Sequence, residues 1–358
     1  MRVLHVINSL NGGGAEKLLT QLLPKLGEWG VEAEVLSLAG SGSELAAILE
    51  RNGIPVRYSR WKSLYSPAQV LAIRKHLGSF QIIHAHLFPA FLWAAIAMQL
   101  LPGKTGIYTE HSTTNRRRRH GLLKLVDSWA YSRYSRIVCI SQGVKQSLAG
   151  HLWRIEGKAV VIHNGIDLNR FSAGPEEGPA SEQGRIVVCV ANLLPYKGQE
   201  VLIRATPLLP GDVRVTLAGR GPLEQRLRAL ARELGVQERV RFLGYVEDVA
   251  AIFRTARICA IPSQWEGFGL AAVEAMASGV PVVASRVPGL AEVVGEAGLL
   301  CEAGSPSDLA EKISALLGSG ELWAEKRRKG LERSREFSID RMVEEHRRLY
   351  AAALGAAS

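Results

Sequence analysis

Two glutamates in one short block, Glu266 and Glu274, are eight positions apart and enclose a glycine-bearing segment. A buried apolar run, Ile258–Ile261, precedes the block, and a helical pattern begins at Gly269. Glycines let the backbone approach a ligand closely, and the free amides at a helix start bind phosphate. A carboxylate beside a phosphate would be repelled, so each glutamate is expected to accept hydrogen bonds from a diol of a sugar or ribose. A purely structural helix start is the less favoured interpretation of the block as a whole.

A lysine and a histidine add chemistry of their own. Lys197 follows a strand-like run of the second half, and a cation there would stabilise the charge that a departing diphosphate develops. His111 ends a strand-like run in the first half, at the edge where a cleft is expected, although such histidines are more often structural. Glu110 beside it is interpreted as structural. His84 and His86 lie on one face of a strand, and no third metal ligand suggests itself.

Three contiguous glycines, Gly12 to Gly14, differ from the Gly-x-Gly-x-x-Gly fingerprint but bring bare backbone to a helix start near Ala15. A tight turn without a ligand is the alternative. Pro24 should bend or end the helix that follows. The run Arg116–Arg119 is interpreted equally as a contact for an anionic membrane or an acceptor phosphate and as a solvated loop. No aromatic residues interleave these arginines, so nucleic acid is not expected as a partner.

The spacing of the aspartates and of the cysteines is also informative. No two of the six aspartates form an Asp-x-Asp pair of the kind that holds a metal on a diphosphate. We therefore expect no metal or other cofactor, and activity that survives chelators. The four cysteines are far apart and mostly inside apolar runs, so we interpret them as small buried hydrophobic residues in a reducing compartment.

Strand-like runs alternate with helical patterns along the whole chain, which predicts parallel sheets covered by helices. The expected strands are 3–7, 33–37, 82–84, 106–109, 137–140, 159–162, 186–191, 213–218, 240–243, 258–261 and 282–284. The expected helices are 15–27, 43–52, 67–77, 88–101, 122–134, 198–208, 222–234, 249–255, 269–277, 306–317 and 338–353.

A segment rich in Gly, Pro, Ser and Glu, residues 171–183, reads as a linker. The fold class is therefore α/β, with two doubly wound Rossmann-like domains facing across a cleft. The expected domains are 1–170 and 184–337, and each is expected to hold one substrate. Ligands of such sheets bind beyond the carboxyl ends of the strands.

Charge is uneven: residues 1–170 carry 21 Lys and Arg against 10 Asp and Glu, a net charge of +11, whereas residues 171–358 have a net charge of −1. A basic first half favours an anionic partner, such as a phospholipid surface or a phosphorylated acceptor. No apolar run is long enough to span a membrane, and no signal peptide is recognised. We expect a cytoplasmic protein, with peripheral contact to the inner face of the membrane as a further hypothesis.

These motifs, in this order, resemble those of the retaining glycosyltransferases of family 4, which have the GT-B fold. The resemblance covers nearly the whole chain. Besides the Glu-x7-Glu block, it is carried by Gly12–Lys17, Tyr108–Ser112, His163–Asp167, Pro195–Gly198, Ala218–Leu223 and the closing Phe337–Ser338 with its helix. It implies that the last segment, 338–358, packs as a helix across the domain junction.

The resemblance also implies roles for residues of the second domain. Glu274 would hold the ribose, Glu266 the sugar, and Lys197 the leaving diphosphate. The family usually has an arginine five residues before this lysine, where this chain has Asn192, and Arg220 is our hypothetical substitute for the missing charge. The expected donor-binding residues are Asn192, Lys197, Arg220, Glu266, Gly267, Phe268, Gly269, Leu270 and Glu274.

In the first domain, the resemblance implies that Gly13, Gly14 and His111 face the acceptor and the reacting carbon. Arg116 and Arg117 of the basic run are added as acceptor contacts. His111, Glu266 and Lys197 are expected to act at the reacting centre. The expected function is transfer of a sugar, with retention, from a UDP- or GDP-linked donor to a glycan or lipid-linked acceptor in cell-surface polysaccharide biosynthesis. The alternatives are a nucleotide-sugar epimerase of the same fold and a non-catalytic nucleotide-sugar-binding partner.

Overall fold

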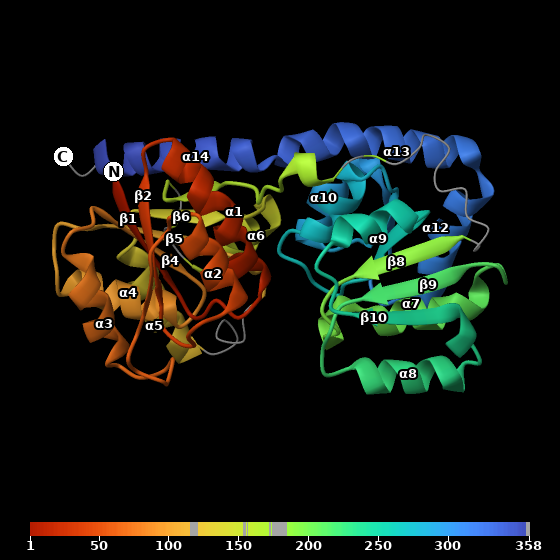
Figure 1. Cartoon of the computed structure of the whole chain (residues 1–358), viewed down its shortest axis with the longest axis horizontal. Helices are drawn as coiled ribbons and strands as arrows, with labels where there is room; N and C mark the ends of the chain where they lie inside the picture. Colours follow the sequence, from red (N-terminus) through yellow and green to blue (C-terminus); the bar gives the residue numbers. More distant parts are fainter. Residues whose placement is uncertain (115–120, 153–154, 156, 172, 174–184, 356–358) are drawn as a thin grey trace. The chain divides into compact units, whose positions relative to one another are not determined.

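The computed structural model describes the chain apart from residues 115–120, 153–154, 156, 172, 174–184 and 356–358. It divides into two compact units, one formed by Met1–Gly165 with Ile339–Ser358 and the other by Ile166–Ser338 (Figure 1). Apart from Phe171 and Ala173, the expected linker lies outside the described residues.

The first unit is built on a parallel sheet with the order β3-β2-β1-β4-β5-β6-β7 among the described residues. Its strands are β1 (Arg2–Ile7), β2 (Glu32–Ser37), β3 (Val56–Tyr58), β4 (Ile82–His86), β5 (Thr105–Glu110), β6 (Arg136–Cys139) and β7 (Ala159–Val161). The order reverses direction at β1 and β4. In doubly wound sheets, such a reversal opens a crevice at the carboxyl ends of those strands.

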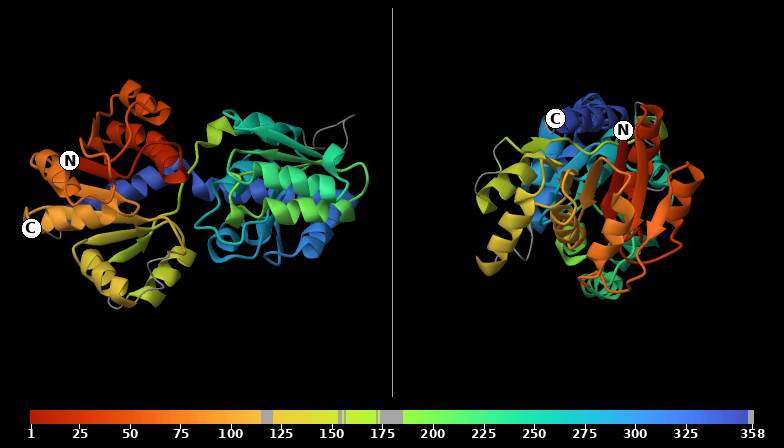
Figure 2. Two further views of the ribbon diagram at one scale, coloured as in Figure 1. Left: turned by 90° about the horizontal axis from the view of Figure 1, so that it is seen from below. Right: turned by 90° about the vertical axis from the view of Figure 1, so that its left-hand side faces the viewer.

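Helices cover both faces of this sheet. One face carries α1 (Gly14–Glu28), α2 (Glu44–Arg51) and α14 (Ile339–Gly355), and α14 lies beside α1 (Figure 1). The other face carries α3 (Gln69–Leu77), α4 (Ala90–Gln99) and α5 (Gly121–Ser132), with α6 (Gln142–His151) following β6. Figure 2, left, shows the red α1–α2 region and the yellow α5–α6 region on opposite sides of the sheet.

Packing, rather than local propensity, decides the course of α1. The sequence led us to expect a bend or an end at Pro24, but the helix continues to Glu28, so an end there was wrong. Leu19, Leu22 and Leu26 of this helix are fully buried against the sheet. Each such burial stabilises the fold by about 1.5–3 kcal/mol, which together exceeds the cost of about 3 kcal/mol for a helix-interior proline.

The second unit repeats the plan with the parallel order β10-β9-β8-β11-β12-β13 among its described residues. Its strands are β8 (Ile186–Val190), β9 (Arg214–Ala218), β10 (Val240–Gly244), β11 (Ile258–Ile261), β12 (Val282–Ser285) and β13 (Leu299–Cys301). Its helices are α7 (Gln199–Ala205), α8 (Glu224–Glu233), α9 (Val249–Thr255), α10 (Leu270–Ala277), α11 (Pro288–Val294), α12 (Pro306–Gly318) and α13 (Gly320–Ser334). Here the reversal falls between β8 and β11.

All the expected strands and helices are present, with small differences in their ends. The four cysteines are buried and free, as interpreted from the sequence, and burial raises the pKa of the Cys189 thiol to about 12. Among the described residues, no helix is both long and apolar enough to cross a bilayer.

Candidate active site

The block around Glu266 forms a strand, a loop and a helix start, in that order. β11 ends at Ile261 and α10 begins at Leu270, with Gly269 between them at φ +100°. A Cβ at Gly269 would lie 2.6 Å from Leu290 Cδ1, so both the backbone angle and the packing require glycine here. The amides of Ala272 and Val273 already donate to the Gly269 carbonyl, at 2.9 and 3.4 Å, so the amides of Leu270 and Ala271 before them are the ones suited to an anion.

Lys197 and Glu266 form an ion pair with 2.6 Å between Nζ and Oε2. Both side chains are about one-fifth exposed, at 20% and 17%, so the pair is screened from solvent but reachable. Ser263 Oγ donates to the same carboxylate oxygen at 3.3 Å. The resemblance implies separate roles for these two residues, on the diphosphate and on the sugar, whereas the structure joins them in one charged pair.

Backbone contact between two loops brings the pair together. Gly198, at φ +70°, is the residue after Lys197, and a Cβ on it would lie 1.9 Å from the carbonyl oxygen of Pro262. The amide of Gln264 donates to the carbonyl of Tyr196 at 2.8 Å. The loops after β8 and β11 are thus fixed against each other at the point where the sheet reverses its strand order.

The remaining expected donor residues differ in what their side chains do. Phe268 is buried and meets Phe337 edge-on at 5.4 Å between ring centroids, so only its backbone is suited to a ligand. Glu274 is half-buried on the first two turns of α10. Asn192 and Arg220 are both exposed, and the Leu193 amide donates to the Arg220 carbonyl at 2.9 Å, which holds their two loops side by side.

In the first unit, the glycine loop follows β1 and leads directly into α1. Gly12 has φ +106°, and open space surrounds the Cβ positions of Gly12 and Gly14. At Gly13 a Cβ would lie 2.2 Å from Glu16 Oε2, so the carboxylate of Glu16 folds back over this glycine. Burial raises the pKa of Glu16. Glu16 belongs to the Gly12–Lys17 motif, but its local context in the sequence predicted no role for it.

Histidines line the neighbouring strands. His5 Nδ1 and His86 Nε2 share a hydrogen bond of 3.0 Å, while the two nitrogens of His84 bond Tyr350 Oη and Thr109 Oγ1, each at 2.7 Å. The absence of a third candidate metal ligand beside His84 and His86 was wrong, because His5 places a ligand atom within 4.8 Å of theirs. Since both nitrogens of His84 are engaged, the cluster fits a hydrogen-bonded polar core better than a metal site.

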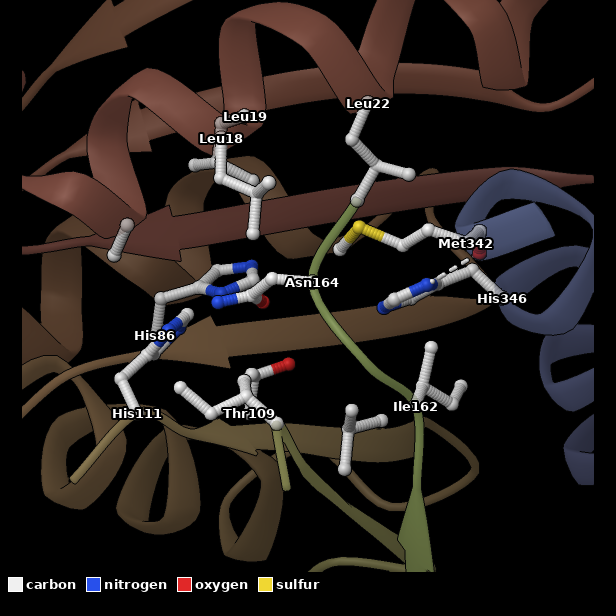
Figure 3. Close-up of a pocket in the computed structure, with 13 residues that line it drawn as sticks. Leu18, Leu19, Leu22, His86, Thr109, His111, Ile162, Asn164, Met342 and His346 are labelled. Carbon is white, nitrogen blue, oxygen red and sulfur yellow. Dashed lines mark hydrogen bonds between the residues drawn. The ribbon is translucent and has the colours of Figure 1, made fainter. Parts of the chain in front are cut away.

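His111 lies at the open end of this histidine row, 5.8 Å from His86 between ring centroids. It lines a cavity together with His86, Asn164 and His346 (Figure 3). Within the described part of the chain, His111 Nε2, His86 Nδ1 and Asn164 Oδ1 are buried without a hydrogen-bond partner. Unsatisfied buried polar atoms are costly, so three of them around one cavity indicate a place for polar ligand atoms or water.

Burial keeps these imidazoles neutral. It lowers the pKa of His5 to about 3 and that of His111 and His346 to about 4. Burial, with neighbouring histidines as a second cause, also places the pKa values of His84 and His86 well below the ordinary value. Near neutral pH, His111 therefore offers one donor and one acceptor rather than a positive charge.

The structure also sorts the other first-domain predictions. Glu110 is buried and accepts hydrogen bonds from Tyr131 Oη and the Ser112 amide, which confirms its structural interpretation. Arg116 and Arg117 lie outside the described residues.

Two residues of this cavity were missed. Asn164 was visible only as part of the His163–Asp167 motif. His346 has a clearer signal, because Met342, His346 and Tyr350 repeat every four residues and so share the buried stripe of α14.

Two doubly wound units, each with polar groups gathered at the carboxyl ends of its strands, define a chain of the GT-B class. Comparison with known families agrees with this assignment. The description "Glycosyltransferase Family 4" matches residues 12–170, and "Glycosyl transferases group 1" matches residues 173–336. The chain belongs to glycosyltransferase family 4.

Individual relatives carry more specific names. A phosphatidyl-myo-inositol mannosyltransferase of Mycobacterium leprae is 31% identical, over 85% of this chain and 84% of that protein. A D-inositol 3-phosphate glycosyltransferase of Mycobacterium sp. (strain JLS) is 40% identical over 50% of this chain, and the match spans 43% of that relative's length. The crystal structure of Anabaena HepE in complex with UDP is 25% identical, with a TM-score of 0.87 over 98% of this chain and 100% of that one.

Proposed function

We propose that this protein transfers a sugar from a nucleoside diphosphate sugar to an acceptor, with retention of the anomeric configuration. The observation that carries the proposal is the Lys197–Glu266 pair beside the start of α10. A cation, a carboxylate and a helix N-terminus at one strand edge match the three needs of such a donor: a diphosphate to neutralise, hydroxyls to orient and a leaving charge to stabilise.

Each group has a distinct task in this proposal. The α10 amides and Lys197 bind the diphosphate and stabilise the negative charge that it gains as the bond to the sugar breaks. Glu266, held by Lys197 and Ser263, accepts hydrogen bonds from sugar hydroxyls. Glu274, within α10, accepts hydrogen bonds from the two hydroxyls of the ribose.

The first unit supplies neutral contacts to the reacting sugar. His111, uncharged near neutral pH, donates to or accepts from a sugar hydroxyl without competing for the leaving phosphate. Gly13 and Gly14 offer backbone close to the acceptor. Retention follows if the acceptor hydroxyl attacks the same face that the phosphate leaves, with the phosphate oxygen taking the proton of the attacking hydroxyl.

Relatives guide the choice of substrates. HepE, which is similar over its full length, was crystallised with UDP, so a UDP-sugar is the first donor to try. Two relatives are named for inositol phosphate and phosphatidylinositol acceptors, and residues 1–170 of this chain have a net charge of +11. We therefore propose a phosphate-bearing acceptor, as a glycan or lipid-linked molecule of cell-surface polysaccharide assembly. Peripheral contact with an anionic membrane belongs to the same proposal.

We also propose that the reaction needs no metal ion. Support comes from the absence of any Asp-x-Asp pair in the sequence and from the cationic and amide groups already available for the diphosphate. Turnover in the presence of EDTA should change by less than about twofold, because these fixed groups replace the ion. Loss of turnover that added manganese restores would overturn this part.

The function as a whole is tested with a panel of nucleotide sugars. Thermal-shift measurements identify the donor, release of UDP or GDP measures turnover, and NMR of the product gives the linkage and the anomer. We expect the donor to raise the melting temperature and the product to keep the donor's anomeric configuration. An inverted product would overturn retention, and no binding of any donor would overturn the proposal.

The alternatives separate in the same assay. An epimerase converts the donor without an acceptor, so a new sugar nucleotide would appear in its absence. A non-catalytic partner binds the donor but releases no nucleotide. Asn192, where the family has an arginine, is the feature that keeps this second alternative open.

Arg220 is proposed to supply the charge that Asn192 lacks. Support comes from the neighbouring loops of these residues and from the exposed guanidinium, which lies 5.7 Å from the Tyr245 ring. Arg220→Ala should lower turnover about tenfold, as the loss of one partly solvated cation would. Normal turnover in this variant would contradict the hypothesis that Arg220 supplies the missing positive charge.

A further inference from the structure

Three polar atoms around the cavity of the first unit share one need. His86 Nδ1, His111 Nε2 and Asn164 Oδ1 are buried, and within the described chain none of them has a hydrogen-bond partner. Their side chains lie at one end of the cavity, whereas His346 lies at the other (Figure 3). His346 donates from Nδ1 to the Met342 carbonyl at 2.9 Å and is thereby held within α14. The three atoms therefore require a common partner.

The cavity has the size of one water molecule. Its volume is about 10 Å³, close to the smallest that holds a water, and a buried water usually makes about three hydrogen bonds. The rings of His86 and His111 are 5.8 Å apart between centroids and make no direct hydrogen bond in the described chain, so a water can lie between them. A sugar ring is too large for this volume. Size and polar lining together select a single water.

We infer that one buried water joins His86, Asn164 and His111 and makes His111 a hydrogen-bond donor toward the proposed sugar site. His86, Asn164 and His5 are then positioning residues, because they act on the sugar only through His111. The inference deepens the proposed function, and it rests on that function only for the sugar as the partner of His111.

The direction of these hydrogen bonds is set at His5. Its Nδ1 shares a hydrogen bond of 3.0 Å with His86 Nε2, while its own Nε2 is buried without a partner in the described chain. A neutral imidazole carries one ring proton. A proton on Nε2 of His5 would be an unpaired buried N–H, which is rarer in proteins than an unpaired acceptor. His5 therefore carries its proton on Nδ1 and donates to His86.

The remaining protons follow from this donor. His86 accepts at Nε2, so its own proton is on Nδ1 and is donated to the water. The water has two protons to give. One goes to Asn164 Oδ1, which only accepts, and the other goes to His111 Nε2. His111 therefore carries its proton on Nδ1, which is the ring nitrogen left for a ligand.

This protonation state suits the proposed site. Burial lowers the pKa of His111 to about 4, so the ring stays neutral near neutral pH. A neutral imidazole could either donate to a sugar oxygen or accept from a sugar hydroxyl. The buried water removes this choice, and His111 offers the sugar a donor without adding a charge beside the leaving phosphate.

The first test is the tautomer of His111 in the full chain without substrates. Long-range proton–nitrogen correlation spectra of a chain labelled with nitrogen-15 histidine distinguish a protonated ring nitrogen from an unprotonated one. The loss of a signal in His111→Gln assigns it. We expect a proton on Nδ1 of His111 and none on Nε2. A proton on Nε2 would overturn the inference, as would a stoichiometric metal ion found at the cluster by elemental analysis.

Variants of His86 test the hydrogen bonds around the water. In His86→Leu the water loses its donor, so His111 should become a mixture of tautomers and kcat should fall about five- to tenfold, with donor affinity unchanged. The amide of His86→Gln can accept from His5 and donate to the water. This variant should keep the Nδ1 proton of His111 and a kcat within about twofold of the unchanged chain. An unchanged His111 tautomer in His86→Leu would overturn the inference.

The matched control is Tyr350→Phe. It removes the hydrogen bond to His84 Nδ1, in the same row of histidines but away from the water, so the His111 tautomer and kcat should not change. If this control altered the tautomer as His86→Leu does, a general loosening of the unit would explain both, and the inference would fall. Circular dichroism melting compares the stability of the variants. Should His86→Leu not fold, the spectra of the unchanged chain and of His86→Gln still decide.

The inference and the proposed function can fail separately, because the tautomer is measured without donor or acceptor. A chain with the expected His111 tautomer that releases no nucleotide from any donor would keep the hydrogen-bond network and lose the proposed function. An active enzyme with the opposite tautomer would keep the function and lose the inference.

Discussion

The two units use the same sheet plan but opposite chemistry at the strand ends. All nine histidines of the chain lie in the first unit, and residues 166–338 contain none. The first unit gathers buried, neutral imidazoles around a cavity where His86 Nδ1, His111 Nε2 and Asn164 Oδ1 have no hydrogen-bond partner in the described chain. The second unit presents a partly open ion pair of Lys197 and Glu266. One fold can thus prepare one side for charge and the other for neutral hydrogen bonds.

The largest effect should come from the charged side. Lys197→Met removes the cation that we propose for the leaving diphosphate and leaves Glu266 without its ion-pair partner, so kcat should fall about 100- to 1000-fold. Nucleotide release under saturating donor measures this. Arg228→Met, which breaks the exposed pair with Glu224, is the matched control and should leave kcat unchanged. A change in kcat of less than about tenfold for Lys197→Met would contradict the proposed difference between a charged site in the second unit and a neutral site in the first.

On the neutral side, His111→Leu should lower kcat about 10- to 100-fold, since the variant loses the hydrogen bond that we propose from His111 to the reacting sugar. His111→Gln keeps a donor and an acceptor and should recover part of that loss. Because burial lowers the pKa of His111 to about 4, the rate should show no titration of this residue between pH 6 and 8. A rate that follows a histidine pKa near 6.5, absent in the variant, would contradict the neutral interpretation.

Acid should destabilise the first unit more than the second. Histidines of the unfolded chain become protonated as pH falls below about 6.5, whereas the buried histidines of the folded chain stay neutral down to about pH 4. Because the unfolded state then binds more protons, the free energy of unfolding decreases as pH falls from about 6.5 to 4. Each buried histidine contributes at most about 1.4 kcal/mol per pH unit. Hydrogen exchange at pH 7 and pH 5, corrected for the intrinsic rate, should show the loss in Met1–Gly165 and in α14. Equal losses in both units would contradict the comparison.

The last prediction concerns stability, not turnover, and compares the glycines that shape the two loops. Gly198→Ala sets a Cβ against a carbonyl oxygen at a positive φ, and should cost about 2–4 kcal/mol of unfolding free energy. Gly13→Ala meets only the end of the Glu16 side chain at an ordinary φ of −83°, so about 1 kcal/mol is expected. Adding Glu16→Ala should relieve the second change and not the first, as chemical denaturation can show. Equal costs would mean that Glu16 is as rigid as the backbone.

Much of the fold followed from the sequence because buried parallel strands are nearly continuous apolar runs. The missed strands, β3 and β13, have three residues each, too few to show a pattern. Three helices were also missed. Helix α11 has only seven residues, too few to show a helical period, whereas α6 and α13 are mostly polar, and their identity depends on the surfaces that they cover. The expectation that the helix could end at Pro24 was wrong for the same reason. Local propensity carries no information about the packing of Leu19, Leu22 and Leu26 on the sheet.

The site was predictable where its residues fall in one segment of the sequence. It was less predictable where the fold brings together residues that are far apart in sequence. The Glu266–Glu274 block and Lys197 were found from their local context, but their ion pair depends on two loops being in contact. His5 is far in sequence from His84 and His86, and only the pairing of β1 with β4 brings it beside them. Asn164 and His346 needed the whole first unit to be assembled before their shared cavity existed.

Helix α14 has a consequence for how the protein is made. Its Tyr350 bonds His84 and its Met342 lies under α1, yet the ribosome produces this helix only after the entire second unit. The second unit can therefore complete its core while the first unit still lacks α14, which covers part of its core. Until that late segment emerges, the nascent first unit exposes an apolar surface that favours chaperone capture, and cleavage before residue 339 would leave it in that state permanently.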